Sequence, residues 1–451
     1  MSLHTVGDGY THYVLPASFD SIPESWKSNK TAKPIASSMQ TVNVPSLSGN
    51  QSLGGSSVIQ IPCGAGAGIA MNAYVRFTLQ MTSGAAVNAS SWQFKGAVQA
   101  ASCAVNRISS YVNSVQVDNI QNAWAAYDCM LANSTSNDWL TRDATLMLGA
   151  GVTYFNNTAA AAANSQGYTF VLPLLGLLGS QQAVPLYLIN GTLQYQIDWQ
   201  SAISSIYQAG ATDPVWTGVT ISNVQLVYDK IMPEQNFIEK VRHDMMQGAK
   251  YVYAYTNLST VTLPTTFAAG AGTLNLNYGL NVSSLQGVLA VQYNSANLAL
   301  VTTGAANSVF SISNNLNQFQ VSLDGRLISS LQLNSTTDPV LLFSEAQKVL
   351  GRLFDASITS PVVNSAAQAF ANGGNASGGN FLTQYFVAGA SAQRVNEGLA
   401  FQGSPCSIMN IQLGLGGTTN GLTGVSSTFY FILLSAFQLL IDATGSVEIV
   451  R

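Results

Sequence analysis

Charged side chains are the scarcest class of residue in this sequence. Asp, Glu, Lys and Arg make up 8% of its 451 residues, compared with roughly 25% in an ordinary soluble protein. Monomers usually stay soluble through surface charge, and the cores of protein interfaces are depleted in Lys, Glu and Asp. The composition therefore favours either a subunit that is buried in a large assembly or a secreted β protein with a neutral polar surface.

Clusters of basic residues are also missing. The formal net charge is -4, and no run of Lys and Arg occurs. Because binding to nucleic-acid phosphates needs clustered basic side chains, we expect no surface dedicated to nucleic acid. The opening MSLHTVGDGY lacks the features of a secretory signal, and the longest apolar run, from Phe429 to Ile441, is too short and too often interrupted to span a bilayer. We expect neither a signal peptide nor a transmembrane segment.

Histidine and cysteine are too few and too scattered for most active sites. The three histidines are His4, His12 and His243, and the four cysteines are Cys63, Cys103, Cys129 and Cys406. No CxxC or Cys/His spacing is present, so we expect no metal site, no cofactor and no catalytic residues. His243 lies between Arg242 and Asp244, which is typical of a solvated helix. The cysteines are expected to be small buried hydrophobes in a reducing compartment.

Two glycine-rich stretches superficially suggest phosphate-binding loops. They span residues 64–68 and 373–379, and neither ends in the GK[ST] that a P-loop requires. We interpret both as loops. The alanine run at 159–163 is interpreted as a surface excursion.

Alternation of apolar and polar residues dominates the sequence and predicts strands. Between 192 and 200, Leu193, Tyr195, Ile197 and Trp199 alternate with polar residues. The same pattern predicts strands at 74–81, 224–228, 309–313, 319–323, 409–415 and 429–434. Many short strands with Gly-rich turns favour sandwiches or barrels.

Helical spacing occurs in three places. Residues 117–131 carry Ile120, Trp124 and Tyr127 after a possible cap at Asp118. A second helix is predicted to begin at Pro233 and to carry Phe237, Ile238, Val241 and Met245. Ser344 is a possible cap for a third helix, which would carry Val349, Leu350, Leu353 and Phe354.

The length predicts more than one domain, because one core usually stops growing at roughly 250 to 300 residues. Residues 234–244 are unusually rich in charge and separate two strand-rich regions. We therefore predict an N-terminal arm at 1–45, a first sandwich at 46–232, a linker helix at 233–250 and a second sandwich at 251–451.

Four segments, in order, resemble the double jelly-roll major capsid proteins of adenovirus hexons, tailless membrane-containing phages, virophages and Polinton-like viruses. Residues 101–139 resemble the family's strand, turn, strand and short helix, with Arg107, Ile108, Val115, Ile120 and Tyr127 at the expected places. Residues 170–199 are similar to its Pro-Leu loop and following strand, residues 224–256 to its strand, charged linker and strand, and residues 429–451 to its last hairpin. These segments cover about half of the chain, which carries less charge than the family usually does.

The resemblance implies an all-β fold of two tandem eight-stranded jelly rolls, with a few short helices and an extended N-terminal arm. It also implies a non-enzymatic major capsid protein that forms homotrimeric, pseudo-hexameric capsomers tiling an icosahedral shell, made and assembled inside the host cell. Its partners would be itself, neighbouring capsomers, penton and minor capsid proteins, and an internal membrane through the arm. The loops at 159–167 and 372–380 would face outwards or lock adjacent capsomers.

A second hypothesis remains open, a secreted or spike-like β-sandwich that recognises glycans. Its candidate platform would be the aromatic set Trp92, Trp124, Trp139, Trp199 and Trp216. Burial in cores or interfaces is the favoured interpretation of these residues, because most of them lie in or beside alternating apolar segments.

Overall fold

The computed structural model describes most of the chain. The described residues are 3–5, 11–13, 37–83, 91–134, 139–152, 154–155, 167–179, 183–208, 216–263, 272–299, 309–328, 332–335, 337–350, 381–382, 384–392, 403–416 and 426–451. The predicted loops at 159–166 and 372–380 and most of the predicted arm lie outside them. Two short strands of the arm, β1 (Leu3–Thr5) and β2 (Thr11–Tyr13), form an antiparallel pair.

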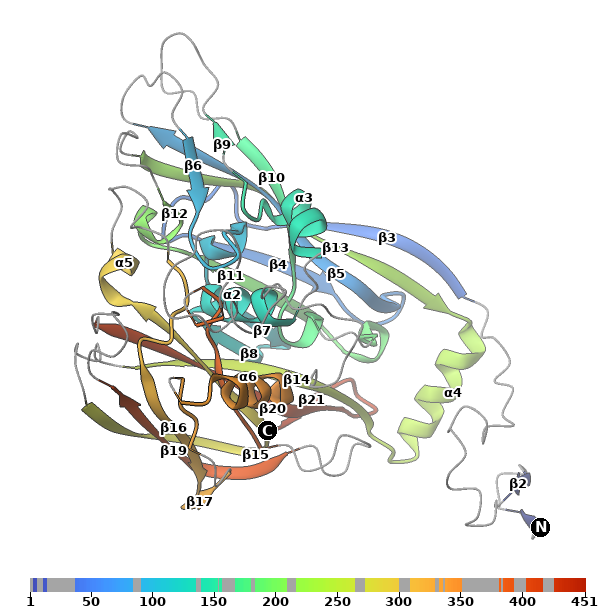
Figure 1. Ribbon diagram of the computed structural model, residues 1–451. Helices are drawn as coiled ribbons and strands as arrows, with labels where there is room; N and C mark the ends of the chain where they lie inside the picture. The colour runs from blue at the N-terminus through green and yellow to red at the C-terminus, as the bar shows by residue number, and fades with distance from the viewer. Residues whose placement is uncertain are drawn as a thin grey trace.

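The first half of the chain folds into two four-stranded antiparallel sheets, ordered β10-β5-β13-β3 and β4-β11-β7-β8 (Figure 1). Their strands are β3 (Ser37–Pro45), β4 (Ser56–Pro62), β5 (Ile69–Ser83), β7 (Val105–Val112), β8 (Val115–Gln121), β10 (Gly167–Pro173), β11 (Thr192–Trp199) and β13 (Trp216–Pro233). When these eight strands are numbered 1 to 8 in chain order, one layer has the strand order 6-3-8-1 and the other has the order 2-7-4-5. This is the strand order of a jelly roll. A small sheet of β6 (Ser91–Phe94), β9 (Tyr154–Phe155) and β12 (Tyr207–Gln208) extends it.

The alternation seen in the sequence builds the core between these sheets. On β11, Leu193, Tyr195, Ile197 and Trp199 are all buried, as the sequence predicts. From the facing sheet, Phe77 brings its ring to 5.1 Å from the ring of Trp199. Burying apolar area at about 25 cal/mol per Å² is the main force that holds the two layers together.

The second half forms another jelly roll, here with all its strands joined into one continuous sheet. Its strands are β14 (Tyr251–Thr262), β15 (Gly272–Asn294), β16 (Leu316–Leu323), β17 (Arg326–Leu327), β18 (Ala388–Ser391), β19 (Ser404–Leu415), β20 (Ser427–Ile441) and β21 (Val447–Val450). The long strand β15 takes the place of both the second and the third strand: residues 272–279 pair with β19, and residues 287–294 pair with β20. The resulting orders, β14-β20-β15-β18 and β15-β19-β16-β17, repeat those of the first roll.

Among the residues that the structure describes, five α-helices and several single turns join the strands. The helices are α2 (Ala123–Ser134), α3 (Ala144–Leu148), α4 (Gln235–Met246), α5 (Ser295–Ala299) and α6 (Pro339–Val349). Short 3-10 or π turns occur at Ala101–Ala104, Trp139–Asp143, Leu177–Gly179, Leu186–Leu188 and Ile203–Ser205. Within the described residues, no helix has the length and hydrophobicity that crossing a membrane requires. The apolar run that ends at Ile441 is strand β20, which lies between β14 and β15.

Helix prediction was right in type and partly wrong in position. The predicted helix at 117–131 begins only at Ala123, because residues up to Gln121 pair with β7 as strand β8; Asp118 is a buried strand residue and not a cap. The cap of α6 is Asp338, which accepts a hydrogen bond from the Leu341 N–H at 2.9 Å, whereas Ser344 lies inside the helix. Leu353 and Phe354 fall outside the described residues.

Three further features differ from the expectations. Ser37–Pro45, which the sequence analysis assigns to the arm, forms β3, the first strand of the first roll, because it pairs along its whole length with β13. Residues 309–313 form only isolated bridges through Ser311 rather than a strand. Pro233 is the last residue of β13, two positions before α4 begins at Gln235. The exact domain boundaries remain a prediction.

Candidate functional site: the seam between the two jelly rolls

The two rolls meet along a seam that helix α2 and strand β8 of the first roll form with β14, β15 and β20 of the second (Figure 1). An aromatic cluster lies at its centre. The ring of Trp124 on α2 lies 5.1 Å from the rings of both Tyr293 on β15 and Tyr430 on β20, and those two tyrosine rings are 5.8 Å apart. Aromatic pairs at such distances contribute about 0.5–1.5 kcal/mol beyond their buried area.

Asp128 places a buried carboxylate beside this cluster. It accepts hydrogen bonds from the N–H groups of Ala97 and Val98, each at 3.0 Å, and from the Tyr293 hydroxyl at 2.9 Å. Burial raises the pKa of the Asp128 carboxyl above its ordinary value, while these donors act in the opposite direction. One side chain thus ties a loop and a helix of the first roll to a strand of the second.

Asp118 forms a second buried acidic position near the seam. Its carboxylate accepts a hydrogen bond from the Leu177 N–H at 2.8 Å. Next to it, the Tyr255 hydroxyl of the second roll donates to the Val117 carbonyl at 3.2 Å. Burial raises the pKa of Asp118 to about 6, although Leu177, Ser110 and Tyr255 favour the charged form.

Polar contacts continue along the rim of the seam. The Lys95 ammonium donates to the carbonyls of Asn297 and Leu298 at 3.3 and 3.2 Å, and burial lowers its pKa to about 8. The Asn122 amide donates to the Thr262 hydroxyl at 2.8 Å, and the Arg451 guanidinium donates to the Gln116 carbonyl at 3.2 Å. The linker helix joins this set, because Arg242 donates to the Tyr187 carbonyl at 3.3 Å.

These contacts couple the two rolls mechanically. If the rolls shift relative to each other, Asp128 loses its bond from Tyr293, and the Lys95 ammonium loses both of its carbonyl acceptors. Leaving such buried polar and charged groups without partners costs about 1–3 kcal/mol or more each. The seam therefore holds the two rolls in one relative orientation. The sequence did not point to Asp128, Tyr255 and Tyr293 as seam residues, and it suggested Asp118 as a helix cap. The available signal was an acid within the apolar stretch AWAAYDCML.

The cysteines and histidines are distributed over the two rolls, the linker helix and the β1–β2 pair. Cys103, Cys129 and Cys406 are buried, Cys63 is partly buried, and all four are free thiols. His243 is exposed on α4, and His4 is the register partner of His12 in the β1–β2 pair. Among the described residues, no three His, Cys, Asp or Glu side chains gather where they could hold a metal ion.

The tryptophans with described side chains are largely buried, as the favoured interpretation predicts. Trp92 and Trp199 are 3% and 1% exposed in the first core. Trp139 is partly buried against that core, and Trp124 lies in the seam. The side chain of Trp216 is outside the described set.

Comparison with known proteins gives a fold and no sequence match. No protein-family model and no curated protein matches the chain. Among solved structures it resembles VP54 of PBCV-1, as fitted into a reconstruction of the virophage Sputnik, with a TM-score of 0.59 at 12% identity over 92% of this chain and 97% of that one. The Sputnik virophage structure gives 0.55 at 12% identity over 98% and 93%, and the mavirus major capsid protein gives 0.53 at 12% over 99% and 96%.

These similar structures are double jelly-roll capsid proteins, and the matches span nearly the whole of each chain. The strand orders of both halves agree with that architecture. The chain therefore has the double jelly-roll fold that the resemblance in its sequence implied.

Proposed function

We propose that this chain is a major capsid protein, a structural subunit that trimerises into pseudo-hexameric capsomers tiling an icosahedral virus shell. The observation that carries the proposal is the pair of jelly rolls with one strand order, held rigidly by a polar and aromatic seam. Two similar bodies in one subunit give a trimer six similar bodies around its axis. A closed ring of this kind follows ordinary cyclic symmetry.

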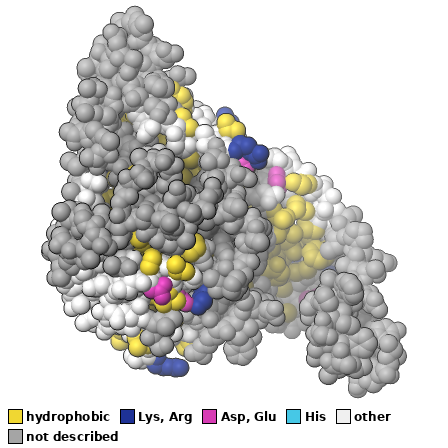
Figure 2. All heavy atoms as spheres, in the orientation of Figure 1, with side chains coloured by type: hydrophobic (Ala, Val, Ile, Leu, Met, Phe, Trp, Pro, Cys, Tyr) yellow, Lys and Arg dark blue, Asp and Glu magenta, His cyan; other side chains and the backbone are white. Residues whose placement is uncertain are grey.

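The surface supports a protein that associates with others. Figure 2 shows few charged side chains on the visible described surface, and it shows hydrophobic side chains gathered between β3 and α4. Met39 of β3 is 64% exposed, and Met246, the last residue of α4, is 75% exposed. The strand register places Met39 beside Ile231, and Ile231 beside Ile69, so one apolar row crosses three strands. Met39 is exposed, whereas Ile231 and Ile69 are partly exposed. An apolar row that reaches the surface in this way is typical of interaction surfaces.

The proposal extends to partners and location. Neighbouring capsomers, penton proteins and minor capsid proteins would contact the outer flanks, and the N-terminal arm would reach an internal membrane. The chain would act in the virion capsid without enzymatic activity. The domain limits carried forward are an arm, a first roll up to 232, a linker helix at 233–250 and a second roll at 251–451, with the first roll extended to begin at β3.

Size-exclusion chromatography with light scattering on recombinant protein, followed by electron microscopy, tests this function. We expect stable trimers with a nearly hexagonal outline, and shells under assembly conditions. A monodisperse monomer at all concentrations would contradict the proposal. If that monomer also bound sugars on a glycan array, the alternative of a glycan-binding module would be favoured.

A further inference from the structure

Both rolls place a tight hairpin between their fourth and fifth strands and build it in the same way. Asn113 and Ser114 connect β7 to β8 with φ of 48° and 69°, and Asp324 and Gly325 connect β16 to β17 with φ of 47° and 79°. Two successive positive φ values are the mark of a type I′ turn. The first turn residue also bonds the neighbouring strand in each roll: Asn113 accepts from the Thr192 N–H at 3.2 Å, and the Asp324 carboxylate accepts from the Ile408 N–H at 2.8 Å.

The residue after the turn differs sharply between the rolls. It is Val115 in the first roll and Arg326 in the second. Because the first roll forms this hairpin with a valine, the turn itself does not require a guanidinium. Arg326 is therefore not needed to form the turn.

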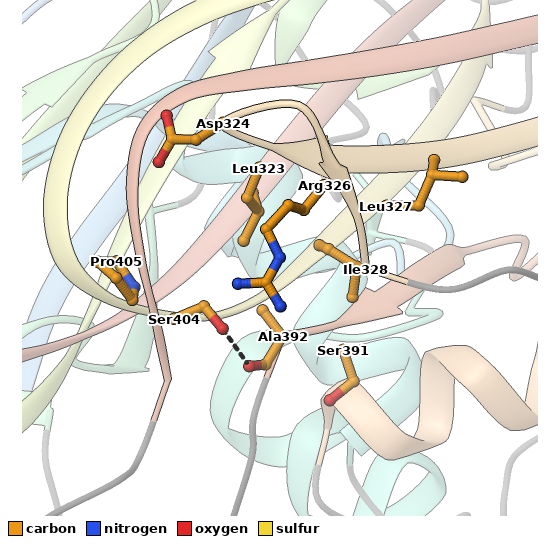
Figure 3. Close-up of a pocket in the computed structure, with 9 residues that line it drawn as sticks. All are labelled: Leu323, Asp324, Arg326, Leu327, Ile328, Ser391, Ala392, Ser404 and Pro405. Atoms are coloured by element: carbon orange, nitrogen blue, oxygen red, sulfur yellow. Dashed lines mark hydrogen bonds between the residues drawn. The ribbon is translucent and has the colours of Figure 1, made fainter.

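Arg326 extends into a pocket of about 350 Å³ beside the hairpin. Figure 3 shows its guanidinium reaching across the pocket towards Ser404 and Ala392, while Asp324, which also lines the pocket, turns its carboxylate away from the guanidinium. The Ser404 hydroxyl donates to the Ala392 carbonyl at 3.2 Å. Within the described part of the chain, Arg326 makes no hydrogen bond or ion pair, although its hairpin is fixed by Asp324.

The chemistry of the pocket fits a carboxylate. A guanidinium offers a planar fork of N–H donors that matches two carboxylate oxygens, and it stays charged at any physiological pH. Apolar side chains also line the pocket, among them Leu327, which is 56% exposed, and Ile328. Arginine is enriched among the interface residues that contribute most of the binding free energy, and such residues usually lie among side chains that exclude water.

We propose that the Arg326 pocket binds a carboxylate side chain of a neighbouring copy of this chain. The identity of the partner rests on the proposed function. Charge balance supports it, since the sequence has 20 acidic and 16 basic residues. The exposed helix α4 offers such groups: Glu239 accepts from the neutral Gln235 amide at 3.0 Å, and Asp244 is exposed. Because the matching turn of the first roll carries Val115, the contact distinguishes the second roll from the first.

Arg326→Val tests the pocket while retaining a hairpin that this protein already forms elsewhere. Arg76→Val is the matched control, because Arg76 is an exposed arginine on β5 of the first roll. Sedimentation velocity over a range of protein and salt concentrations should show roughly tenfold weaker self-association for R326V, with weaker salt dependence, and little change for R76V. Equal behaviour of the two variants would overturn the pocket proposal and leave the capsid function standing if the wild type assembles.

Arg326→Lys permits a direct identification of the partner group. A carbodiimide that joins an amine to a carboxylate in contact, applied to assemblies mixed from 15N-labelled and unlabelled R326K chains, should give a cross-link from position 326 to an Asp or Glu of the other copy. Absence of this cross-link, while other lysines in the assembly form theirs, would overturn the proposal. A wild-type monomer that binds N-acetylneuraminic acid and loses it in R326V would also overturn it, in favour of a sugar acid.

Discussion

The two jelly rolls share one strand order but turn the corner between their second and third strands in different ways. In the first roll, β4 and β5 are separate strands joined by the glycine-rich residues 64–68. In the second, β15 continues through the corner with Asn281 at a φ of 50° and shifts in its pairing on either side. The same topology is thus compatible with two local solutions, a glycine loop and a bent strand.

The helices between the fifth and sixth strands differ in the same manner. Asp128 of α2 is buried and serves the seam. Glu345 of α6 is also buried but pairs with Lys348 of its own helix, whose side chain is 44% exposed. The first roll therefore depends on polar groups that it shares with the second, whereas the acid of the second roll is satisfied within its own helix. Four predictions test these differences between the rolls.

Asp128→Ala is expected to have the largest effect. It leaves the N–H groups of Ala97 and Val98 and the Tyr293 hydroxyl without their acceptor, so we expect a loss of about 3–5 kcal/mol in the free energy of unfolding. Glu345→Ala, the matched change in the second roll, should cost about 1 kcal/mol or less, since its partner is largely exposed. Urea denaturation followed by far-ultraviolet circular dichroism, which reports on the strands of both rolls, measures both. Equal losses would mean that the seam has no special dependence on Asp128.

Gly68→Ala should have the next largest effect. Gly68 has a φ of +71°, and a Cβ there would lie 2.5 Å from the Ile231 carbonyl oxygen, so we expect a loss of about 2–4 kcal/mol. At the corner of the second roll, Gly279 has no positive φ, and a Cβ would meet nothing within 4 Å. Gly279→Ala should therefore be nearly neutral by thermal denaturation. A neutral Gly68→Ala would show that the first corner can relax as readily as the second.

Acidification should stabilise the first roll. Burial raises the pKa of Asp118 from 3.8 to about 6, so between these values the folded state holds a proton that the unfolded chain releases. The free energy of unfolding should therefore fall as the pH rises through this window, by about 2–3 kcal/mol. In the second roll, the hydrogen bond from Thr444 lowers the pKa of Asp442. The stability that Asp442 contributes is therefore lost as the pH falls, which is the opposite dependence to that of Asp118.

Asp118→Asn should flatten the pH dependence, with the remaining slope due to the raised pKa of Asp128. Urea denaturation at pH 4.5 and pH 7 provides the measurement, and the tryptophans with described side chains, Trp92, Trp124, Trp139 and Trp199, all belong to the first roll and report on it. An unchanged slope in D118N would contradict the assignment to Asp118.

The sequence predicted the strands that have one buried face, but it did not reveal features that depend on contacts between residues far apart in the chain. Alternation located β5, β11, β16, β19 and β20, because one buried face is written into each strand. It could not reveal that residues 37–45 pair with β13. Seven of these nine residues are exposed and two are partly buried, so the segment has no buried face, and its partner strand lies about 190 positions away in the sequence. Asp118 shows the same limit: an acid before an apolar stretch resembles a helix cap, and only the distant Leu177 reveals a buried strand residue. The seam and the Arg326 pocket also depend on such distant partners.

The cap of α6 provides the smallest and most local test. Asp338→Ala removes the acceptor for the Leu341 N–H and should lower the free energy of unfolding by about 1 kcal/mol. Ser344, which the sequence suggested as the cap, donates to the Val340 carbonyl from within the helix, so Ser344→Ala should change stability little. Hydrogen–deuterium exchange of peptides covering 337–350 separates the two, with faster exchange expected for D338A alone. Because α6 holds its acid within its own helix, this fraying should leave exchange in α2 unchanged; a parallel increase there would mean that the two rolls unfold as one unit.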